Sequence, residues 1–247
     1  RHAGYCYGVE RALRLTEDAL EGVERPVATL GPIIHNPGVV KALAERGVGV
    51  VDDVSQATDG TLVVRTHGVA PEVVATALAR RLEVVDATCP FVAVAQRKAR
   101  ALHEAGYTVV ILGEHDHPEV VGLQGFAGGE AIVVADPGDV PVERLKNRKV
   151  GVVVQTTQAR DTLAGLAAAL APQAASHLGG LRAEPDVSKA VVGRDAAVGQ
   201  LALIVVHAGH HRPIGQQGGE PKRLGAGIVA ALETLAVSIV VRAILGR

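Results

Sequence analysis

The fold is decided by the stretch LEVVDATCPFVAVAQRKARALHEAGYTVVILGEH at residues 82–115. It opens with a Val-rich run, continues with apolar residues at helical spacing over 92–106, and closes with a second aliphatic run. A short apolar run bounded by turn residues is typical of a buried parallel strand, and the 3.6-residue period indicates an amphipathic helix. The stretch therefore predicts strand, helix and strand in succession, which is the pattern of an α/β protein.

The same alternation extends along most of the chain. A helix is predicted to begin within GYCYGVERAL at residues 4–13, and a further one covers 157–171. Additional Val- and Ile-rich runs that predict strands lie at 47–53, 60–68, 130–136, 149–157 and 201–206. We expect an α/β fold with mostly parallel sheets.

A weak internal repeat predicts how the chain is divided. Cys6 and Cys89 each stand in a loop directly before a predicted helix, and a third copy, PDVSKAVVGRDAAVGQLA at 185–202, has Ser188 in the place of the cysteine. We expect three α/β units in a pseudo-threefold, trefoil-like arrangement around a central cleft. The predicted units are 1–88, 89–180 and a divergent, shortened unit at 181–247.

Composition excludes several classes of function. The chain has 247 residues, of which 48% are hydrophobic and 21% charged, and its formal net charge is −1. No basic stripe or acidic tail favours nucleic acid or a membrane surface, and 2% aromatic residues are too few for base stacking. The apolar segment 227–245 is interrupted by Glu233 and Arg242 and is too short to span a bilayer. We expect a globular protein that contacts neither nucleic acid nor membrane.

The two cysteines favour a reducing compartment. Two thiols cannot build a disulfide framework, so we expect reduced, chemically active thiols in the cytoplasm. The chain begins at Arg1 and contains no Met. We therefore expect a first strand upstream of Arg1 in the intact protein.

Cys6 has two interpretations from the residues alone. It lies just before a predicted helix N-terminus, where free N–H groups and the positive end of the helix dipole favour a thiolate. Alternatively it is a buried cysteine that packs as a small apolar residue.

Other polar residues follow predicted strands. His67, Cys89, His117 and Thr156 come after four of these runs, and ligands of open α/β sheets bind outside the carboxyl ends of the strands. We expect one cleft to collect them. Each also has a simpler interpretation, because a histidine beside Gly or Pro is commonly a surface loop residue.

The segments HDHPEV at 115–120 and QTT at 155–157 leave alternatives open. His115 and His117 are possible metal ligands. Glu119 is a candidate general acid, since partial burial favours a protonated carboxyl, or else a solvated loop carboxylate. Thr157 is a candidate N-cap of the following helix.

The order of six motifs resembles one known family. They are AGYCYGVERAL (3–13), GPIIHNPGVV (31–40), VVRTHGV (63–69), VVDATCPFV (84–92), HDHPEVVG (115–122) and VVVQTT (152–157). In this order they resemble the LytB-type reductases, the 4-hydroxy-3-methylbut-2-enyl diphosphate reductases of the non-mevalonate isoprenoid pathway. The similarity is clear from about residue 3 to residue 170. It implies reductive dehydroxylation of the substrate to isopentenyl and dimethylallyl diphosphate.

The resemblance also implies a cofactor. Cys6 and Cys89 match two of the three thiolate ligands of a [4Fe–4S] cluster, a group that soft sulfur donors bind well. The third cysteine of the family corresponds to Ser188, whose hydroxyl is a poor, hard ligand for iron. An electron-donor protein such as ferredoxin or flavodoxin is implied as a partner.

The family's substrate-binding residues match positions of this chain one by one. His35, His67 and His117 match the histidines around the diphosphate and the allylic alcohol, and His117 also belongs to the implied catalytic set. Glu119 matches the proton donor, and Thr156 matches the threonine that positions the substrate hydroxyl.

The C-terminal part departs from the family pattern. Gly218, Gly219 and Glu220 occupy the place of the family's Ser/Asn-rich diphosphate clamp, and Ser238 is the match for its last phosphate-binding serine. Two other readings therefore stand beside the reductase. One is a cluster-free relative that binds a phosphorylated ligand or a protein partner, and the other is a metal-dependent hydrolase built on the His-rich loops.

Overall fold

The computed structural model describes residues 5–21, 25–146, 148, 150–178, 193–194 and 202–206. These residues form two compact units. The first contains the described residues up to Arg100 together with Asp116–Gly129, and the second contains Ala101–His115 and the described residues from Glu130 onward.

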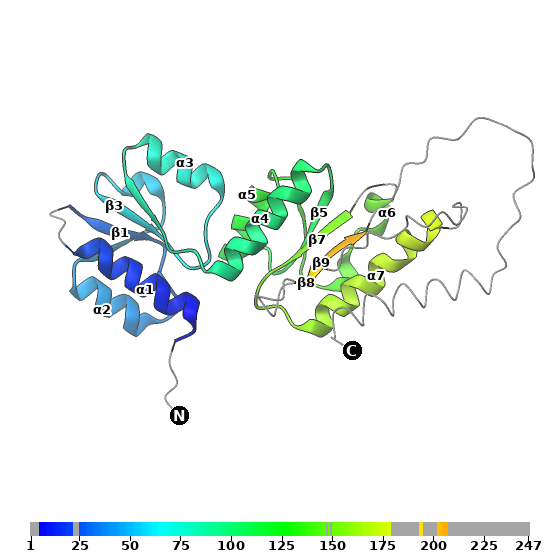
Figure 1. The fold of residues 1–247 in the computed structure, drawn as a ribbon, viewed down its shortest axis with the longest axis horizontal. Coiled ribbons are helices and arrows are strands. Elements are labelled where there is room, and N and C mark those ends of the chain that lie inside the picture. Colours follow the sequence, from blue (N-terminus) through cyan, green and yellow to red (C-terminus); the bar gives the residue numbers. More distant parts are fainter. Residues whose placement is uncertain are drawn as a thin grey trace, which may run out of the picture. The chain divides into compact units, whose positions relative to one another are not determined.

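The first unit is built on a parallel sheet with the strand order β2-β1-β3-β4, of which Figure 1 labels β1 and β3. Its strands are β1 (Val27–Leu30), β2 (Val48–Val51), β3 (Thr61–Val64) and β4 (Glu83–Asp86). All carboxyl ends lie at the same edge, because every pair in the sheet is parallel. The loops that follow β1, β3 and β4 therefore meet there.

Helices cover both faces of this sheet. Residues of α1 (Tyr7–Leu20) and α2 (Pro37–Glu45) share a buried cluster with Val27 and Val63. On the other face, α3 (Pro71–Ala79) packs with Leu30 and Leu62 (Figure 1). Successive strand residues point to opposite faces, so a strand buried on both sides reads as a continuous aliphatic run. This is why β3 was predictable from the sequence.

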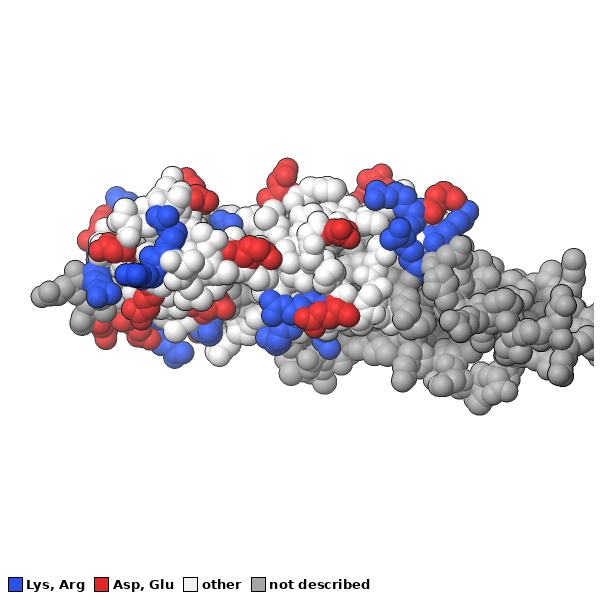
Figure 2. Space-filling view, turned by 90° about the horizontal axis from the view of Figure 1, so that it is seen from above, with Lys and Arg blue, Asp and Glu red and all other residues white. Residues whose placement is uncertain are grey.

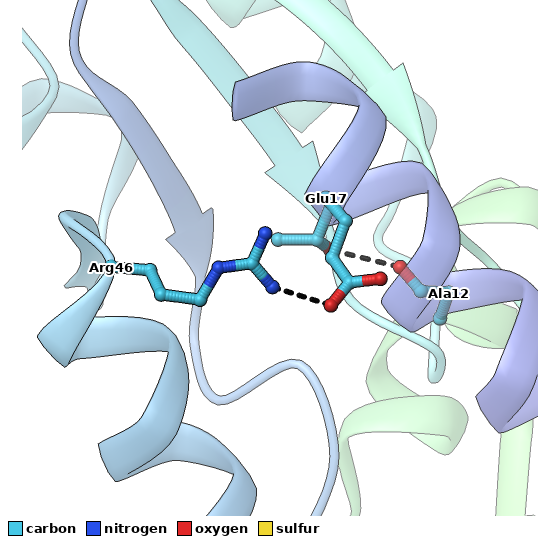
Figure 3. A network of polar contacts seen from close by, with 4 residues as sticks. Ala12, Glu17 and Arg46 are labelled. Carbon is cyan, nitrogen blue, oxygen red and sulfur yellow. Dashed lines mark hydrogen bonds and ion pairs between the residues drawn. The ribbon is translucent and has the colours of Figure 1, made fainter. Parts of the chain in front are cut away.

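A side-chain cap begins α2 of the first unit, and an ion pair connects the end of α2 to α1. Asn36 caps α2, where its Oδ1 accepts hydrogen bonds from the N–H groups of Gly38 and Val39 at 3.0 and 3.2 Å. Arg46, directly after α2, forms an ion pair with Glu17 of α1 (Figure 3). Both side chains are about half exposed, so this pair contributes little to stability. The remaining elements of the unit are η1 (Val54–Gln56), α5 (Pro118–Phe126) and the start of α4 (Pro90–Glu104).

The second unit is a mixed sheet with the order β6-β5-β7-β9-β8. Its strands are β5 (Thr108–Leu112), β6 (Ile132–Val134), β7 (Val150–Val154), β8 (Gly193–Arg194) and β9 (Ala202–Val206). β5 pairs in parallel with β6 and β7, whereas β9 runs antiparallel to β7. The helical elements are η2 (Pro137–Asp139), α6 (Val142–Leu145) and α7 (Arg160–Leu178).

The core of the second unit lies between the sheet and α7. Leu163 and Leu166 of α7 share a buried cluster with Val110 and Val152 of the strands. Gly151 leaves room for another packing contact, because a Cβ there would lie 2.7 Å from both methyl carbons of Leu102 at the end of α4. The strand centre thus packs directly on a helix side chain.

The predicted α/β class with parallel sheets is confirmed. The run at 201–206 forms β9 as expected, although antiparallel to its neighbour β7. β1 was not among the predicted strands. The division into units 1–88, 89–180 and 181–247 stays a prediction. Among the described residues, the segment Asp116–Gly129 packs with the first unit.

Charged side chains of both signs are mixed on one face of the described residues. On the face shown in Figure 2, Lys and Arg side chains are interspersed with Asp and Glu over the described residues. None of the described helices is long and apolar enough to cross a membrane.

Candidate active site

Three loops at the carboxyl edge of the first sheet are joined by one threonine. Thr66 donates to the carbonyl of Ile33 from its N–H at 3.3 Å and from its buried hydroxyl at 3.0 Å. The carbonyl of Thr66 in turn accepts a bond of 2.9 Å from the N–H of Cys89. These hydrogen bonds therefore fix the positions of the loops that carry His35, His67 and Cys89 relative to one another.

Three histidines converge at this edge. The ring centroids of His35 and His67 are 4.7 Å apart, and those of His67 and His117 are 5.3 Å apart with the rings nearly perpendicular. One ring nitrogen of each histidine lies within 4.8 Å of the others. The structure thus brings together three residues that are widely separated in sequence, from the loop after β1, the loop after β3 and the N-cap of α5. Their role in substrate binding stays a prediction.

His117 is oriented by the start of α5. It is the N-cap residue, and its Nδ1 accepts a hydrogen bond of 3.2 Å from the N–H of Glu119. Because Nδ1 is the acceptor, the neutral ring carries its proton on Nε2. A ring in this tautomer donates a hydrogen bond through Nε2 and has no lone pair there for a metal ion. The geometry favours recognition of an anion over metal binding at His117.

His67 remains uncharged near neutral pH. Its pKa is lowered to about 4, mainly by burial and in addition by the neighbouring rings of His35 and His117 and the guanidinium of Arg65. Its Nδ1 is buried without a hydrogen-bond partner among the described residues. A neutral imidazole can donate one hydrogen bond and does not add a permanent positive charge to the cluster.

Two residues beside His67 were missed by sequence reasoning. Arg65 packs over Gly31, which has a φ of +70° and no Cβ to obstruct the guanidinium, and burial lowers the pKa of Arg65 while Asp52 opposes this shift. Gln96 of α4 is buried, with its amide against Gly68. The only sequence signal for either is its closeness to a motif, because both contacts depend on the fold.

Glu119 lies in the most enclosed part of this region. It is in the first turn of α5 and only 1% exposed. The alternative of a solvated loop carboxylate is therefore wrong, because α5 packs against the loop after β3: Gly122 lies by Val69 and Gly125 by Ala70.

Both cysteines stand at the beginning of a helix. Cys6 is the exposed N-cap of α1, and Cys89 directly precedes α4 and accepts its first helical bond from Ala93 N–H at 2.9 Å. The alternative of a buried, apolar Cys6 is wrong. Both thiols are free. A Cβ on Gly8 would lie 2.6 Å from Sγ of Cys89, so the first turn of α1 lies directly against that thiol.

The donor chemistry of this pair fits a metal–sulfur group. Thiolates are the preferred ligands of iron–sulfur clusters, and helix N-termini favour their anionic form. Gly8 leaves open the space beside Cys89 that any larger residue would fill. Ser188, the predicted third ligand, and Ser238, the predicted phosphate ligand, lie outside the described residues.

Thr156 belongs to the second unit, in the turn after β7. The preceding Gln155 is buried, accepts a bond of 3.0 Å from Glu114 N–H, and donates one of 2.8 Å to the hydroxyl of Thr157. Thr157 is not the N-cap of α7, which begins three residues later at Arg160, so that prediction is wrong. The position of Thr156 in a common cleft with the histidines stays a prediction.

Comparison with known proteins gives consistent matches. A family model described as LytB protein matches residues 1–211. The 4-hydroxy-3-methylbut-2-enyl diphosphate reductase of Pelobacter propionicus is 45% identical over 163 residues, which is 66% of this chain and 58% of that protein. The enzyme of the same name from Geobacter metallireducens is 48% identical over 164 residues, 66% of this chain and 57% of that protein.

Solved structures show the same similarity. The E-1-hydroxy-2-methyl-but-2-enyl-4-diphosphate reductase of Plasmodium falciparum matches with a TM-score of 0.64 and 29% identity, over 68% of this chain and 54% of that one. A structure of (E)-4-hydroxy-3-methyl-but-2-enyl diphosphate reductase, described as the terminal enzyme of the non-mevalonate pathway, matches with a TM-score of 0.62 and 36% identity, over 70% and 62%. The matched part of the chain spans less than two thirds of the length of these relatives.

Proposed function

Because the chain belongs to the LytB protein family, we propose that it catalyses the reaction for which its relatives are named. The substrate is 4-hydroxy-3-methylbut-2-enyl diphosphate, and the products are isopentenyl and dimethylallyl diphosphate. The C–O bond to the allylic hydroxyl breaks, two electrons and two protons are consumed, and the oxygen leaves as water. The observation that carries this proposal is the convergence of three histidines beside the buried Glu119.

The histidine cluster supports binding of the diphosphate. Nε2 of His117 is a donor, since Nδ1 accepts from Glu119 N–H. His67 is neutral and offers a further N–H, and His35 is exposed at the mouth of the cluster. Phosphate oxygens accept such bonds readily, and a negatively charged ligand strengthens them.

Glu119 has the properties of a proton donor. Its carboxyl group is almost entirely buried beside the histidine cluster, where a carboxyl group is placed to pass a proton to a bound substrate. The hydroxyl that leaves as water is the acceptor of that proton. Thr156 would hold that hydroxyl in place through its own side chain.

Cys6 and Cys89 would hold a [4Fe–4S] cluster, with Ser188 at the position of the third ligand. When bound, the cluster supplies the two electrons of the reduction, which reach it from a carrier protein of the ferredoxin or flavodoxin class. The free thiols suit the reducing conditions of a cytoplasm, where we place the protein.

Anaerobic reconstitution with iron and sulfide tests the proposal. We expect bound iron and sulfide, the absorption of a cluster, and conversion of the diphosphate substrate when a chemical reductant supplies electrons. A Cys6→Ser, Cys89→Ser protein serves as the control and should bind no cluster.

The two rival functions give different results in the same experiment. A cluster-free relative would bind the diphosphate without taking up iron. A metal-dependent hydrolase would release phosphate when zinc is added, a result that the Nε2–H tautomer of His117 speaks against. Either outcome would overturn the reductase proposal.

A further inference from the structure

Arg11 connects the two helix starts that carry the cysteines. It lies on α1, and its guanidinium reaches the segment between β4 and Cys89. Nη1 donates to the carbonyl of Thr88 at 3.1 Å, and Nη2 donates to the carbonyl of Asp86 at 3.3 Å. Thr88 directly precedes Cys89 in the sequence. A single side chain therefore bridges the helix that follows Cys6 and the backbone next to Cys89.

The N–H groups of this segment have other partners. The carboxylate of Asp86 accepts a bond of 2.9 Å from Thr88 N–H, and Thr66 accepts from Cys89 N–H at 2.9 Å. The N–H groups of the segment are thus bound by Asp86 and by the loop after β3, whereas its carbonyls at 86 and 88 are bound by Arg11. Removing the guanidinium would take this donor from the partly buried carbonyl of Thr88, and a buried acceptor left without a donor costs more than the bond itself contributes; the bond to Asp86 is exposed and matters less.

The guanidinium suits this bridge because of its shape. Its planar fork presents two donors at a fixed spacing, so it can bind two carbonyls of one turn at the same time. A lysine ammonium is a single donor centre on a flexible chain and cannot reproduce that fork. Gly8, also in the first turns of α1, is the residue that lies against the thiol of Cys89.

We propose that Arg11 is a positioning residue for the pair of thiols. By fixing α1 to the carbonyls before Cys89, it sets the separation of Cys6 and Cys89, so that both sulfurs can bind one metal group. The inference rests on the proposed function for the identity of that group. The thiol pair itself binds soft metal ions independently of the enzyme's reaction.

Cadmium binding to the reduced apoprotein tests this role. Cd²⁺ is titrated while the sulfur-to-cadmium charge-transfer absorption is followed, in wild type, Arg11→Met, Arg11→Lys and Arg14→Met. Arg14 is an exposed arginine on the same helix and serves as the matched control. We expect Arg11→Met to bind Cd²⁺ at least about tenfold more weakly, the effect typical of losing a residue that orients metal ligands. Arg11→Lys should fall between the two, and Arg14→Met should match wild type.

Several outcomes would overturn the inference. Equal Cd²⁺ affinity in Arg11→Met and wild type would show that the bridge does not fix the positions of the two thiols. An equal loss of affinity in Arg14→Met would show that the effect comes from removing a positive charge from α1 and not from the bridge. If circular dichroism shows that Arg11→Met does not fold, Arg11→Lys is used for the test instead. Wild-type Cd²⁺ affinity in Arg11→Lys would then show that the two-donor guanidinium is not needed to position the thiols. If the cadmium charge-transfer absorption is unchanged in Cys6→Ser, then Cys6 and Cys89 do not bind the metal together.

The proposed function can fail separately. If wild type takes up no iron and sulfide, while Arg11→Met still weakens Cd²⁺ binding, then the reductase proposal fails and the positioning role stands. If Arg11→Met takes up the cluster normally and its Cd²⁺ affinity is unchanged, then the positioning role fails and the reductase proposal stands.

Discussion

His67 makes the stability of the fold depend on pH in a defined direction. Its pKa falls from 6.5 to about 4 on folding, mainly because of burial and in part because of the neighbouring His35, His117 and Arg65. Between these values the unfolded chain binds a proton that the folded protein does not, so the free energy of unfolding falls as the pH is lowered from about 6.5 to about 4. The slope from one group is at most about 1.4 kcal/mol per pH unit, and solvent screening of a partly exposed ring reduces it.

Urea unfolding at a series of pH values measures this effect. His67→Asn should flatten the slope in that window, whereas His103→Asn, at an exposed position near the end of α4, should leave it unchanged. An unchanged slope in His67→Asn would show that another group is responsible. Titration of the His67 ring by NMR gives the same answer directly.

Glu119→Gln separates proton donation from binding. The amide preserves the size of the side chain but cannot give up a proton, so turnover by the reconstituted enzyme should fall by about 100-fold or more. Substrate affinity should change far less, because the histidines would still hold the diphosphate. The exposed Glu114 supplies the control, since Glu114→Gln should keep normal turnover. Undiminished turnover in a cluster-loaded Glu119→Gln protein would exclude Glu119 from the proposed mechanism.

At the scale of secondary-structure elements, replacing Gly8 in the first turn of α1 by alanine has two opposing effects on stability. Alanine raises helix propensity by up to about 1 kcal/mol. Its Cβ, however, would lie 2.6 Å from Sγ of Cys89, and such overpacking typically costs about 1–3 kcal/mol. We therefore expect Gly8→Ala to be net destabilising and to lower the iron bound after reconstitution.

The matched substitution is Gly38→Ala in the first turn of α2. A Cβ there would meet only the side-chain oxygen of Asn36, at 3.3 Å. Unfolding midpoints and iron content should stay near wild type in this control. If Gly8→Ala proves as stable and as rich in iron as Gly38→Ala, then α1 does not press on the thiol as described.

An element could be predicted from the sequence when its own residues carry the pattern, and not when its pairing with other strands defines it. β3 and β5 are aliphatic runs buried on both faces, so the sequence marks them clearly. β1, with the sequence VATL between Pro26 and Gly31, is short and contains a polar residue, so it was missed although it lies inside the sheet. Its partners on both sides define it, and such pairing is not written in a local pattern.

The same distinction holds for the candidate site. His35, His67 and His117 were predictable as a group because each lies in a recognisable motif and the carboxyl ends of parallel strands meet. The contacts that orient them were not predictable. The bond from Glu119 N–H to His117 requires the capping geometry of α5, and the bridge from Arg11 requires two helices to be packed. Tertiary contacts of this kind join residues with no common local signal.

At the scale of the whole molecule, we expect the C-terminal part to determine how firmly a cluster would be held. Ser188 occupies the position of the third thiolate in the resemblance, and an alcohol is a hard ligand whose deprotonation is costly. Ser188→Cys should therefore increase iron and sulfide per chain and slow the loss of the cluster under anaerobic conditions.

Side-by-side reconstitution of both proteins, followed by iron counting and the decay of the cluster absorption, measures this gain. Ser176→Cys, at another position outside the motifs, shows whether any added thiol has the same effect. Identical iron content and decay in Ser188→Cys and wild type would place residue 188 away from the ligand position.

The bonds made by Thr66 also bear on how this edge of the sheet moves. The loops after β1, β3 and β4 are linked in series through Ile33, Thr66 and Cys89, so none of them can detach without breaking a bond to the next. Connected segments of this kind open as a single cooperative unit rather than as three independent loops. In deuterium exchange the amides of Thr66 and Cys89 should exchange at a common rate, closer to that of the strands than of surface turns. The edge that carries the histidines and a cysteine would then behave as a preformed rigid frame.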